Sequence, residues 1–250
     1  MNGILLVDKP ILYTSHDMVD VVRRKTGIRR VGHAGTLDPM ATGLLIMLLG
    51  PSTSLFQDLS VLDKDYEGIM TLGMETRTQD LEGMVTRTAS YEHIREKDVR
   101  AAFGRFTGKI QQTVPQYSSA KVKGKKGYEL ARKSIPFDAP VKTVEIKRLD
   151  LLRFSPPDVY FSTRVSKGTY LRAVCADVGS ELGAGMVLSS LRRTRVGAFD
   201  VADSLSPENL KRLDGSEIAR RAADALTAWK KRPAESASWL SRIMPGRNAR

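Results

Sequence analysis

The apolar residues of this chain are arranged in short runs, which sets the first limit on its fold. The most apolar run, residues 44–49, is far below the roughly 18 residues that a membrane-crossing helix needs. It therefore belongs in a buried core, and we interpret residues 41–49 as a buried helix. Residues 1–10 lack a secretory pattern, so we expect no membrane contact and a cytoplasmic location.

Several stretches carry recognisable strand or helix patterns. Strands are predicted at residues 3–7, 66–72, 144–154 and 159–165. Helices are predicted from Ser15, the expected N-cap, to Gly27, and at residues 169–182 and 186–192, with a late helix whose apolar stripe is Ile218, Ala222, Leu226 and Trp229. Residues 32–39 are predicted to form a loop, and residues from 232 onward a poorly ordered tail. Because strands and helices mix without strict alternation, the sequence favours an α+β fold with a mostly antiparallel sheet.

Metal-binding residue types are scarce. The single cysteine, Cys175, excludes a disulfide within the chain and lies in an apolar stretch, where a core position is expected. The three histidines, His16, His33 and His93, are not at the spacing of metal ligands. We therefore expect no metal.

The net charge of +12 comes from two segments. Residues 105–135 hold eight Lys or Arg and one acidic residue, and residues 207–250 hold ten basic and five acidic residues. Such concentration favours surfaces that face a polyanion. The alternative is that these are solvated faces, which suits the second segment better because its charges are mixed.

The segment with the most chemical content is Val31–Gly43, a glycine-rich stretch with one carboxylate, Asp38, directly before a proline. Proline favours an extended backbone at Asp38 and disfavours helix there. A carboxylate presented in this way suits a nucleophile or a general base. The alternative is that Asp38 caps the helix that is predicted to follow it.

The same segment resembles the motif G-H-x-G-T-L-D-P-x-A-T-G that surrounds the catalytic aspartate of the TruB family of tRNA pseudouridine synthases. Other stretches resemble further family motifs in the same order, over roughly residues 2–200. They are Asp8-Lys9-Pro10 with Thr14-Ser15; Lys64, Tyr66, Leu72-Gly73, Thr76, Thr78, Asp80 and Gly83; Gln112, Pro115, Tyr117-Ser118, Ala120-Lys121, Gly124, Tyr128 and Ala131-Arg132; residues 166–172; and Leu191-Arg192-Arg193.

This resemblance implies roles for individual residues. Asp38 would free uracil from the ribose, Arg172 would orient Asp38 through a bidentate pair and hold it ionised, and Tyr66 would stack on the base and take part in proton transfer. Further residues would bind substrate: Lys9 and His33 would contact RNA, Tyr170 and Leu191 would line the uracil pocket, and Tyr117 and Lys121 would belong to an RNA-gripping insertion. Without the motifs, Tyr66 would be a core residue and Arg172 and Lys9 surface cations.

The resemblance also implies a pseudouridine synthase fold with a central RNA-binding cleft. The partner would be the T-arm stem-loop of tRNA, with no obligate protein partner. The target base must be flipped out of the RNA, and phosphate contacts from a flexible basic loop around Lys121 to Lys126 would offset that cost. The isomerisation has no redox or hydrolytic step, so no cofactor is expected.

Some positions depart from the family pattern. Ile11 and Leu12 stand where the family usually has a glycine, Val114 where it often has proline, and Ala34 where Thr or Ser is common. We expect residues 1–205 to form the catalytic domain, with its insertion at about 105–135. Residues 206–250 are expected to form a helix and a basic tail without a complete PUA domain.

Two other functions remain open on sequence grounds. A dyskerin-type synthase would act on RNA selected by a guide ribonucleoprotein, and such proteins normally keep the PUA domain. A tRNA-folding chaperone without catalysis would not need Asp38, Tyr66 and Arg172 together.

Overall fold

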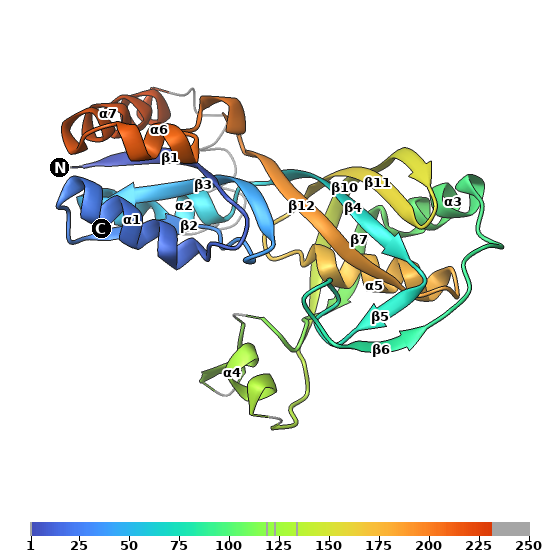
Figure 1. Ribbon diagram of the computed structural model, residues 1–250. Helices are drawn as coiled ribbons and strands as arrows, with labels where there is room; N and C mark the ends of the chain where they lie inside the picture. Colours follow the sequence, from blue (N-terminus) through green and yellow to red (C-terminus); the bar gives the residue numbers. More distant parts are fainter. Residues whose placement is uncertain (1, 119, 123, 134, 232–250) are drawn as a thin grey trace, which may run out of the picture.

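The computed structural model of the protein describes residues 2–231 apart from 119, 123 and 134. Within these residues the main feature is a nine-stranded sheet with the order β1-β3-β12-β4-β11-β10-β7, in which β2 lies beside β3 and β13 beside β12 (Figure 1). All pairs are antiparallel except β12 with β3. The strands are β1 (Gly3–Lys9), β2 (Val31–Ala34), β3 (Ala41–Leu49), β4 (Lys64–Leu72), β7 (Gly108–Thr113), β10 (Val141–Ser155), β11 (Asp158–Val165), β12 (Met186–Val196) and β13 (Phe199–Asp200).

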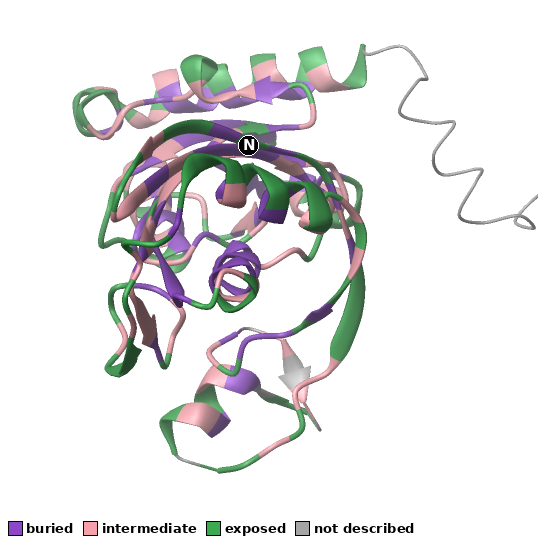
Figure 2. Cartoon of the chain, turned by 90° about the vertical axis from the view of Figure 1, so that its right-hand side faces the viewer, coloured by how far each residue is buried: buried purple, intermediate pink, exposed green. Residues whose placement is uncertain are grey.

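Helices flank this sheet, so the predicted α+β fold is confirmed. They are α1 (Ser15–Thr26), α2 (Phe56–Ser60), α3 (Glu96–Phe106), α4 (Gly127–Arg132), α5 (Leu171–Glu181), α6 (Pro207–Arg212) and α7 (Gly215–Lys230), with 3-10 turns at Gly50–Leu55 and Val201–Asp203. Figures 1 and 2 show α7 lying along the outer strand β1. Covering an edge strand in this way removes a site of unwanted strand pairing.

The helix predicted at residues 41–49 is wrong, because these residues form strand β3. Its side chains are buried on both faces of the sheet: Leu45, Met47 and Leu49 join one core cluster, and Leu44, Ile46 and Leu48 join the other. A strand covered on both sides is apolar at every position, so it lacks the alternation that identifies a half-buried strand. An unbroken apolar run is therefore compatible with either element.

Three other predicted elements need correction. Residues 186–192, predicted to be helical, belong to β12, which pairs with β3 on one side and β4 on the other. The predicted loop at 32–39 begins only after β2. The N-cap of α1 is Thr14 rather than Ser15, because Thr14 and Asp17 exchange hydrogen bonds in a capping box.

The remaining predicted strands and helices are confirmed. The predicted strands correspond to β1, β4, β10 and β11. Helix α1 ends at Gly27, which adopts the left-handed conformation. The stripe Ile218, Ala222, Leu226 and Trp229 packs against the sheet from α7, and Cys175 is fully buried in the core. The predicted tail from residue 232 lies outside the described residues.

The basic insertion has more structure than the flexible loop predicted for it. Strands β8 (Lys121–Val122) and β9 (Lys125–Lys126) form a short hairpin that leads into α4. Figure 1 shows this unit projecting away from the sheet. Strands β5 (Met74–Thr76) and β6 (Val85–Thr88) form a second small hairpin.

No helix in the described part of the chain is long and apolar enough to span a membrane. Nor do three or more His, Cys, Asp or Glu side chains gather anywhere among the described residues in a way that would hold a metal ion.

Candidate active site

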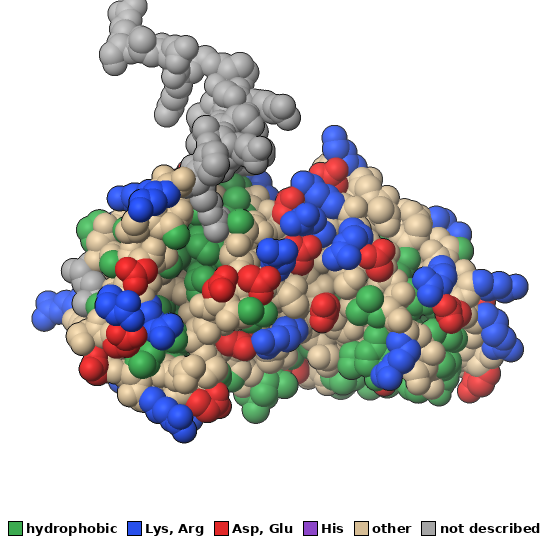
Figure 3. Space-filling view, turned by 90° about the horizontal axis from the view of Figure 1, so that it is seen from above, with side chains coloured by type: hydrophobic (Ala, Val, Ile, Leu, Met, Phe, Trp, Pro, Cys, Tyr) green, Lys and Arg blue, Asp and Glu red, His purple; other side chains and the backbone are tan. Residues whose placement is uncertain are grey.

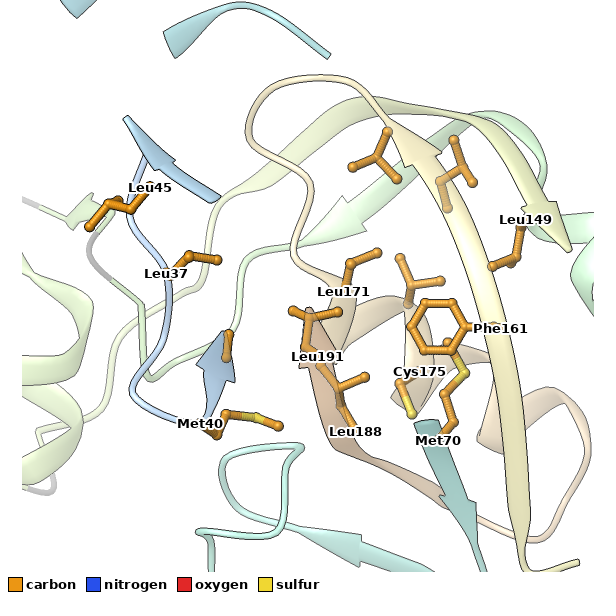
Figure 4. Packing of buried hydrophobic residues seen from close by; sticks show 14 of the residues in the cluster. Leu37, Met40, Leu45, Met70, Leu149, Phe161, Leu171, Cys175, Leu188 and Leu191 are labelled. Atoms are coloured by element: carbon orange, nitrogen blue, oxygen red, sulfur yellow. The ribbon is translucent and has the colours of Figure 1, made fainter. Parts of the chain in front are cut away.

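Asp38 lies on the short loop between β2 and β3, and its neighbours anchor that loop in the core. Leu37 and Met40 are buried in the cluster that also contains Leu171 and Leu191, as Figure 4 shows. The Asp38 side chain between them remains 41% exposed. The loop therefore presents one carboxylate to solvent from a backbone whose flanking residues are fixed by packing.

Three buried polar side chains hold the backbone of this loop. The Ser15 hydroxyl accepts a hydrogen bond from the Leu37 amide at 2.8 Å and lies 3.1 Å from the Leu37 carbonyl oxygen, to which it donates. Lys9 Nζ donates to the carbonyl of Pro39 at 3.3 Å, and Arg193 donates to the carbonyl of Gly35 at 3.0 Å. Residues from the two N-terminal motifs and from the late Leu-Arg-Arg motif thus all bind the backbone of the loop that carries Asp38.

Arg172 is a buried residue that pairs with Asp38. Its side chain is only 5% exposed, and its Nε lies 2.9 Å from Asp38 Oδ2. The two terminal nitrogens donate elsewhere, to the carbonyls of Thr78 at 2.7 Å and Tyr117 at 3.0 Å. The bidentate pair predicted for Arg172 and Asp38 is therefore wrong: a single nitrogen makes the contact, and the other two fix the guanidinium plane.

Asp80 is a second carboxylate at Arg172, to which the sequence analysis assigned no role. It is buried, and its Oδ2 lies 3.6 Å from Arg172 Nε. Its Oδ1 accepts hydrogen bonds from the Thr78 hydroxyl and from the Glu82 amide. Thr78 and Asp80 both belong to the family motif that runs from Lys64 to Gly83 and contains Tyr66, so the signal was their spacing within that motif.

A second acidic side chain, Glu82, follows Asp80 in the same turn. Burial raises the pKa of Glu82, and the nearby carboxylates of Asp80 and Asp38 raise it further. Negative charge is therefore concentrated around Arg172, whose buried cation balances part of it.

Lys9 is a buried cation in contact with the loop that carries Asp38. Lys9 is fully buried, with Nζ also donating to the carbonyls of Pro10 at 2.9 Å and Tyr13 at 2.6 Å. Burial lowers the pKa of Lys9 to about 8, although Asp38 acts in the opposite direction. The RNA contact predicted for Lys9 is contradicted, because its ammonium group is enclosed by backbone carbonyls and does not reach the surface.

His33 lies on β2. Burial and the charge of Arg193 lower the pKa of His33, which favours the neutral ring. Its Nδ1 is buried and has no hydrogen-bond partner among the described residues. A neutral, half-buried imidazole suits stacking better than contact with phosphate.

The predicted pocket residues come from three elements near the middle of the sheet. Tyr66 lies on β4 and pairs in register with Arg193, while Leu191 on β12 pairs with Ala41 on one side and Gly68 on the other. Tyr66 packs against the buried cluster that contains Leu191. Tyr170 precedes α5, where the buried side chain of Gln112 donates to its carbonyl and accepts from its amide.

The two predicted insertion residues are placed differently. The carbonyl of Tyr117 accepts a hydrogen bond from Arg172, so the start of the insertion is joined directly to the site. The backbone of Lys121 lies in β8, but its side chain is outside what the structure describes.

The arrangement supplies an accessible carboxylate, 41% exposed, whose Oδ2 is held by Arg172. Such a group acts as nucleophile or base.

Comparison with known proteins identifies the family. The family model described as TruB family pseudouridylate synthase, N-terminal domain, matches residues 23–171. The tRNA pseudouridine synthase B of Opitutus terrae is 43% identical over 221 residues, covering 88% of this chain and 92% of that protein. That of Clostridium tetani is 36% identical over 244 residues, covering 98% of this chain and 84% of that protein.

Solved structures agree. A chain in the crystal structure of a Cbf5-Nop10-Gar1 complex is 25% identical with a TM-score of 0.68, over 88% of this chain and 59% of that one. A chain in the archaeal box H/ACA sRNP Nop10-Cbf5 complex is 26% identical with a TM-score of 0.63, over 88% and 58%. This chain thus spans less than two thirds of each of these neighbours. The fold, the motifs and the relatives lead to one assignment: the chain belongs to the TruB family of pseudouridylate synthases and is an isomerase.

Proposed function

We propose that this enzyme converts a uridine in the T-arm of tRNA to pseudouridine, with Asp38 as the catalytic carboxylate. The observation that carries the proposal is the accessible Asp38 side chain, held by buried Arg172 on a loop that three other buried side chains fix. The relatives named tRNA pseudouridine synthase B support tRNA as the substrate.

The reaction breaks the bond between N1 of uracil and C1′ of the ribose and forms a bond from C5 to C1′. The proton on C5 is lost and N1 becomes protonated, so atoms and electrons balance without an oxidant or a second substrate. Asp38 serves as nucleophile or base in this exchange. Either role requires an oriented carboxylate, and Arg172 supplies the orientation.

The target base must leave the RNA stack to reach Asp38, which costs a few kcal/mol. Tyr66, Leu191 and Tyr170 would enclose the flipped uracil, with Tyr66 stacking on it. His33, neutral and half-buried, would stack beside the displaced nucleotide. Lys9 acts indirectly, by holding the carbonyl of Pro39.

Phosphate contacts from the insertion would offset the cost of flipping. Lys125, Arg132 and Lys133 are exposed there, and Tyr117 connects the insertion to Arg172. The basic residues of α7 are less suited, because Arg220 and Arg221 pair with Glu217, and Arg220 also with Asp224. Figure 3, which views this face from above, shows Lys and Arg interspersed with Asp and Glu.

We assign catalysis to residues 1–205 and a supporting role to α6 and α7. We also assign the enzyme to the cytoplasm, where it acts on tRNA without a guide RNA or obligate protein partner. The alternative is guide-dependent modification. The observation in its favour is the structural likeness to Cbf5.

The test incubates an unmodified tRNA transcript with the purified protein alone and maps pseudouridine by mass spectrometry after chemical labelling. We expect one pseudouridine, in the T-arm. Asp38→Asn, which keeps the shape but loses the nucleophile and base, should abolish it while tRNA binding persists. Modification only when a guide RNA is added would support the alternative, and activity of the Asn variant within tenfold of wild type would exclude Asp38 as the catalytic group.

A further inference from the structure

Exposed apolar side chains gather around the Asp38–Arg172 pair. Among the described residues, ten large apolar side chains are exposed, and half of them lie on two loops bordering this pair: Ile11, Leu12, Tyr13, Leu81 and Met84, here called the apolar rim. Contiguous exposed apolar surface marks an interaction site more often than scattered single residues do.

The first loop of the rim is joined to the loop that carries Asp38. The Leu12 amide donates to the carbonyl of Pro39 at 2.9 Å, and Lys9 Nζ donates to the carbonyl of Tyr13. Ile11, Leu12 and Tyr13 are nevertheless 57%, 75% and 43% exposed. Their backbone is therefore fixed at the site while their side chains point to solvent.

Leu12 is also strained. Its φ of 71° lies in the left-handed region, which glycine adopts freely and a branched side chain adopts at a cost. Strained backbone of this kind clusters at active sites and ligand-binding sites. An exposed leucine with no core to fill is best explained by something that binds against it.

The second loop of the rim is joined to Arg172. Leu81 and Met84 flank Glu82, whose pKa responds to the charges of Asp38, Lys9 and Arg172. The loop is anchored by the Thr78 carbonyl, which accepts from Arg172, and by the Arg77 amide, which donates to the carbonyl of Met84 at 3.0 Å. Hydrogen bonds thus join one part of the rim to the loop that carries Asp38 and the other part to Arg172.

We propose that the apolar rim binds the faces of the unpaired bases that flank the target uridine in the RNA loop. This rests on the proposed function, which brings a flipped uridine to Asp38 and its neighbours to the rim. Unpaired bases stack on aromatic and apolar side chains, and Tyr13 offers such a ring. Residues 10–14 carry no charge, so this loop offers no cation to a phosphate group.

The test is a double-mutant cycle between protein and RNA. One protein partner is the variant Leu12→Gly with Tyr13→Ser, in which glycine also relieves the strain and so protects folding. The RNA partners are a synthetic T-arm stem-loop and the same stem-loop with abasic sites at the two nucleotides flanking the target. Dissociation constants are measured over a range of salt concentrations.

We expect the double variant to bind the intact stem-loop roughly tenfold more weakly than wild type, as expected for lost stacking on about one base. On the abasic stem-loop both proteins should bind equally. The log–log salt slope should not change, because no phosphate contact is lost. Tyr13→Phe keeps the ring and should bind like wild type. Leu152→Ala is the matched control, an exposed leucine (57%) on β10 away from the rim.

An equal loss on both RNAs, or a flattened salt slope, would overturn the proposal. So would self-association of the wild-type protein that the double variant abolishes, because the rim would then be a protein interface. Modification of the intact stem-loop by the wild-type enzyme is measured separately. Its failure would count against the proposed function, whereas the binding cycle alone decides the role of the rim.

Discussion

Arg172 uses its guanidinium nitrogens on three separate segments of the chain. Nε contacts Asp38, one terminal nitrogen contacts the carbonyl of Thr78, and the other contacts that of Tyr117. A planar fork with fixed angles makes all three contacts at once, whereas the point charge of lysine does not. The same residue therefore orients the Asp38 carboxylate, the proposed catalytic group, and connects it to the β5–β6 hairpin and to the insertion.

Replacing Arg172 by lysine tests this geometry. Arg172→Lys keeps a charge but cannot satisfy Asp38 and both carbonyls, so we expect kcat to fall roughly 100-fold, the scale seen when one oriented polar contact is lost. The tRNA dissociation constant should change little, since the buried side chain does not reach RNA. Arg195→Lys, in an exposed ion pair with Asp200, is the control and should leave both constants unchanged. Equal losses in kcat and binding would show that Arg172 contacts phosphate.

Individual residues differ in how far the sequence could place them. The pairing of Asp38 with Arg172 followed from two motifs, and the structure brings these residues together. The enclosure of Lys9 did not follow, because its partners are the backbone carbonyls of Pro10, Tyr13 and Pro39. Carbonyl groups belong to every residue, so no pattern of side chains reveals where they converge.

At the level of elements, β1, β4, β10 and β11 were predicted as strands, whereas β3 and the first part of β12 were mistaken for helices. β11 places Val159, Phe161, Thr163 and Val165 on one buried face. β3 is buried on both faces, so it has no polar face to mark it. In β12 the register shifts twice against β4, between Leu188 and Ser190 and between Arg193 and Arg195, and such irregularities interrupt a regular alternation. What identifies them is their pairing, which depends on residues distant in sequence.

Gly43 lies where β3 and β12 pair, in register with Arg193. Its φ is 99°, and an added Cβ would lie 2.8 Å from the amide nitrogen of Arg193 and closer still to its carbonyl oxygen. Gly43→Ala should therefore destabilise the protein by about 3 kcal/mol or more, through strain and a clash with a backbone that cannot move aside. Urea unfolding followed by fluorescence measures the change.

The control for Gly43 is Gly104, an exposed glycine in α3 with no atom near its added Cβ. Gly104→Ala should stabilise the protein by about 0.5–1 kcal/mol, because alanine favours helix. If both variants were equally stable, the close approach of β3 and β12 at Gly43 would not be required by the fold.

Across the whole molecule, charge is distributed so that one region is free to meet RNA. The net charge of +12 has two sources, but the basic residues of α7 are partly paired with acids on the same helix. Exposed cations of the insertion stand on a unit that projects from the sheet (Figure 1). Sequence charge counts located both segments, but only the fold distinguishes paired from unpaired charge.

Salt dependence of tRNA binding separates these two sources. A variant with Lys125, Arg132 and Lys133 changed to Ala should bind tRNA more weakly and with a flatter log–log salt slope, by roughly 0.7 to 0.9 for each lost phosphate contact. Turnover at saturating tRNA should change little, since none of the three faces Asp38. The matched variant changes Arg220, Arg221 and Lys230 of α7 to Ala, which removes the same charge. Its slope should stay near that of wild type, because two of those cations are already neutralised by Glu217 and Asp224. If the α7 variant flattened the slope and the insertion variant did not, the RNA grip would lie along α7 and the insertion would have another role.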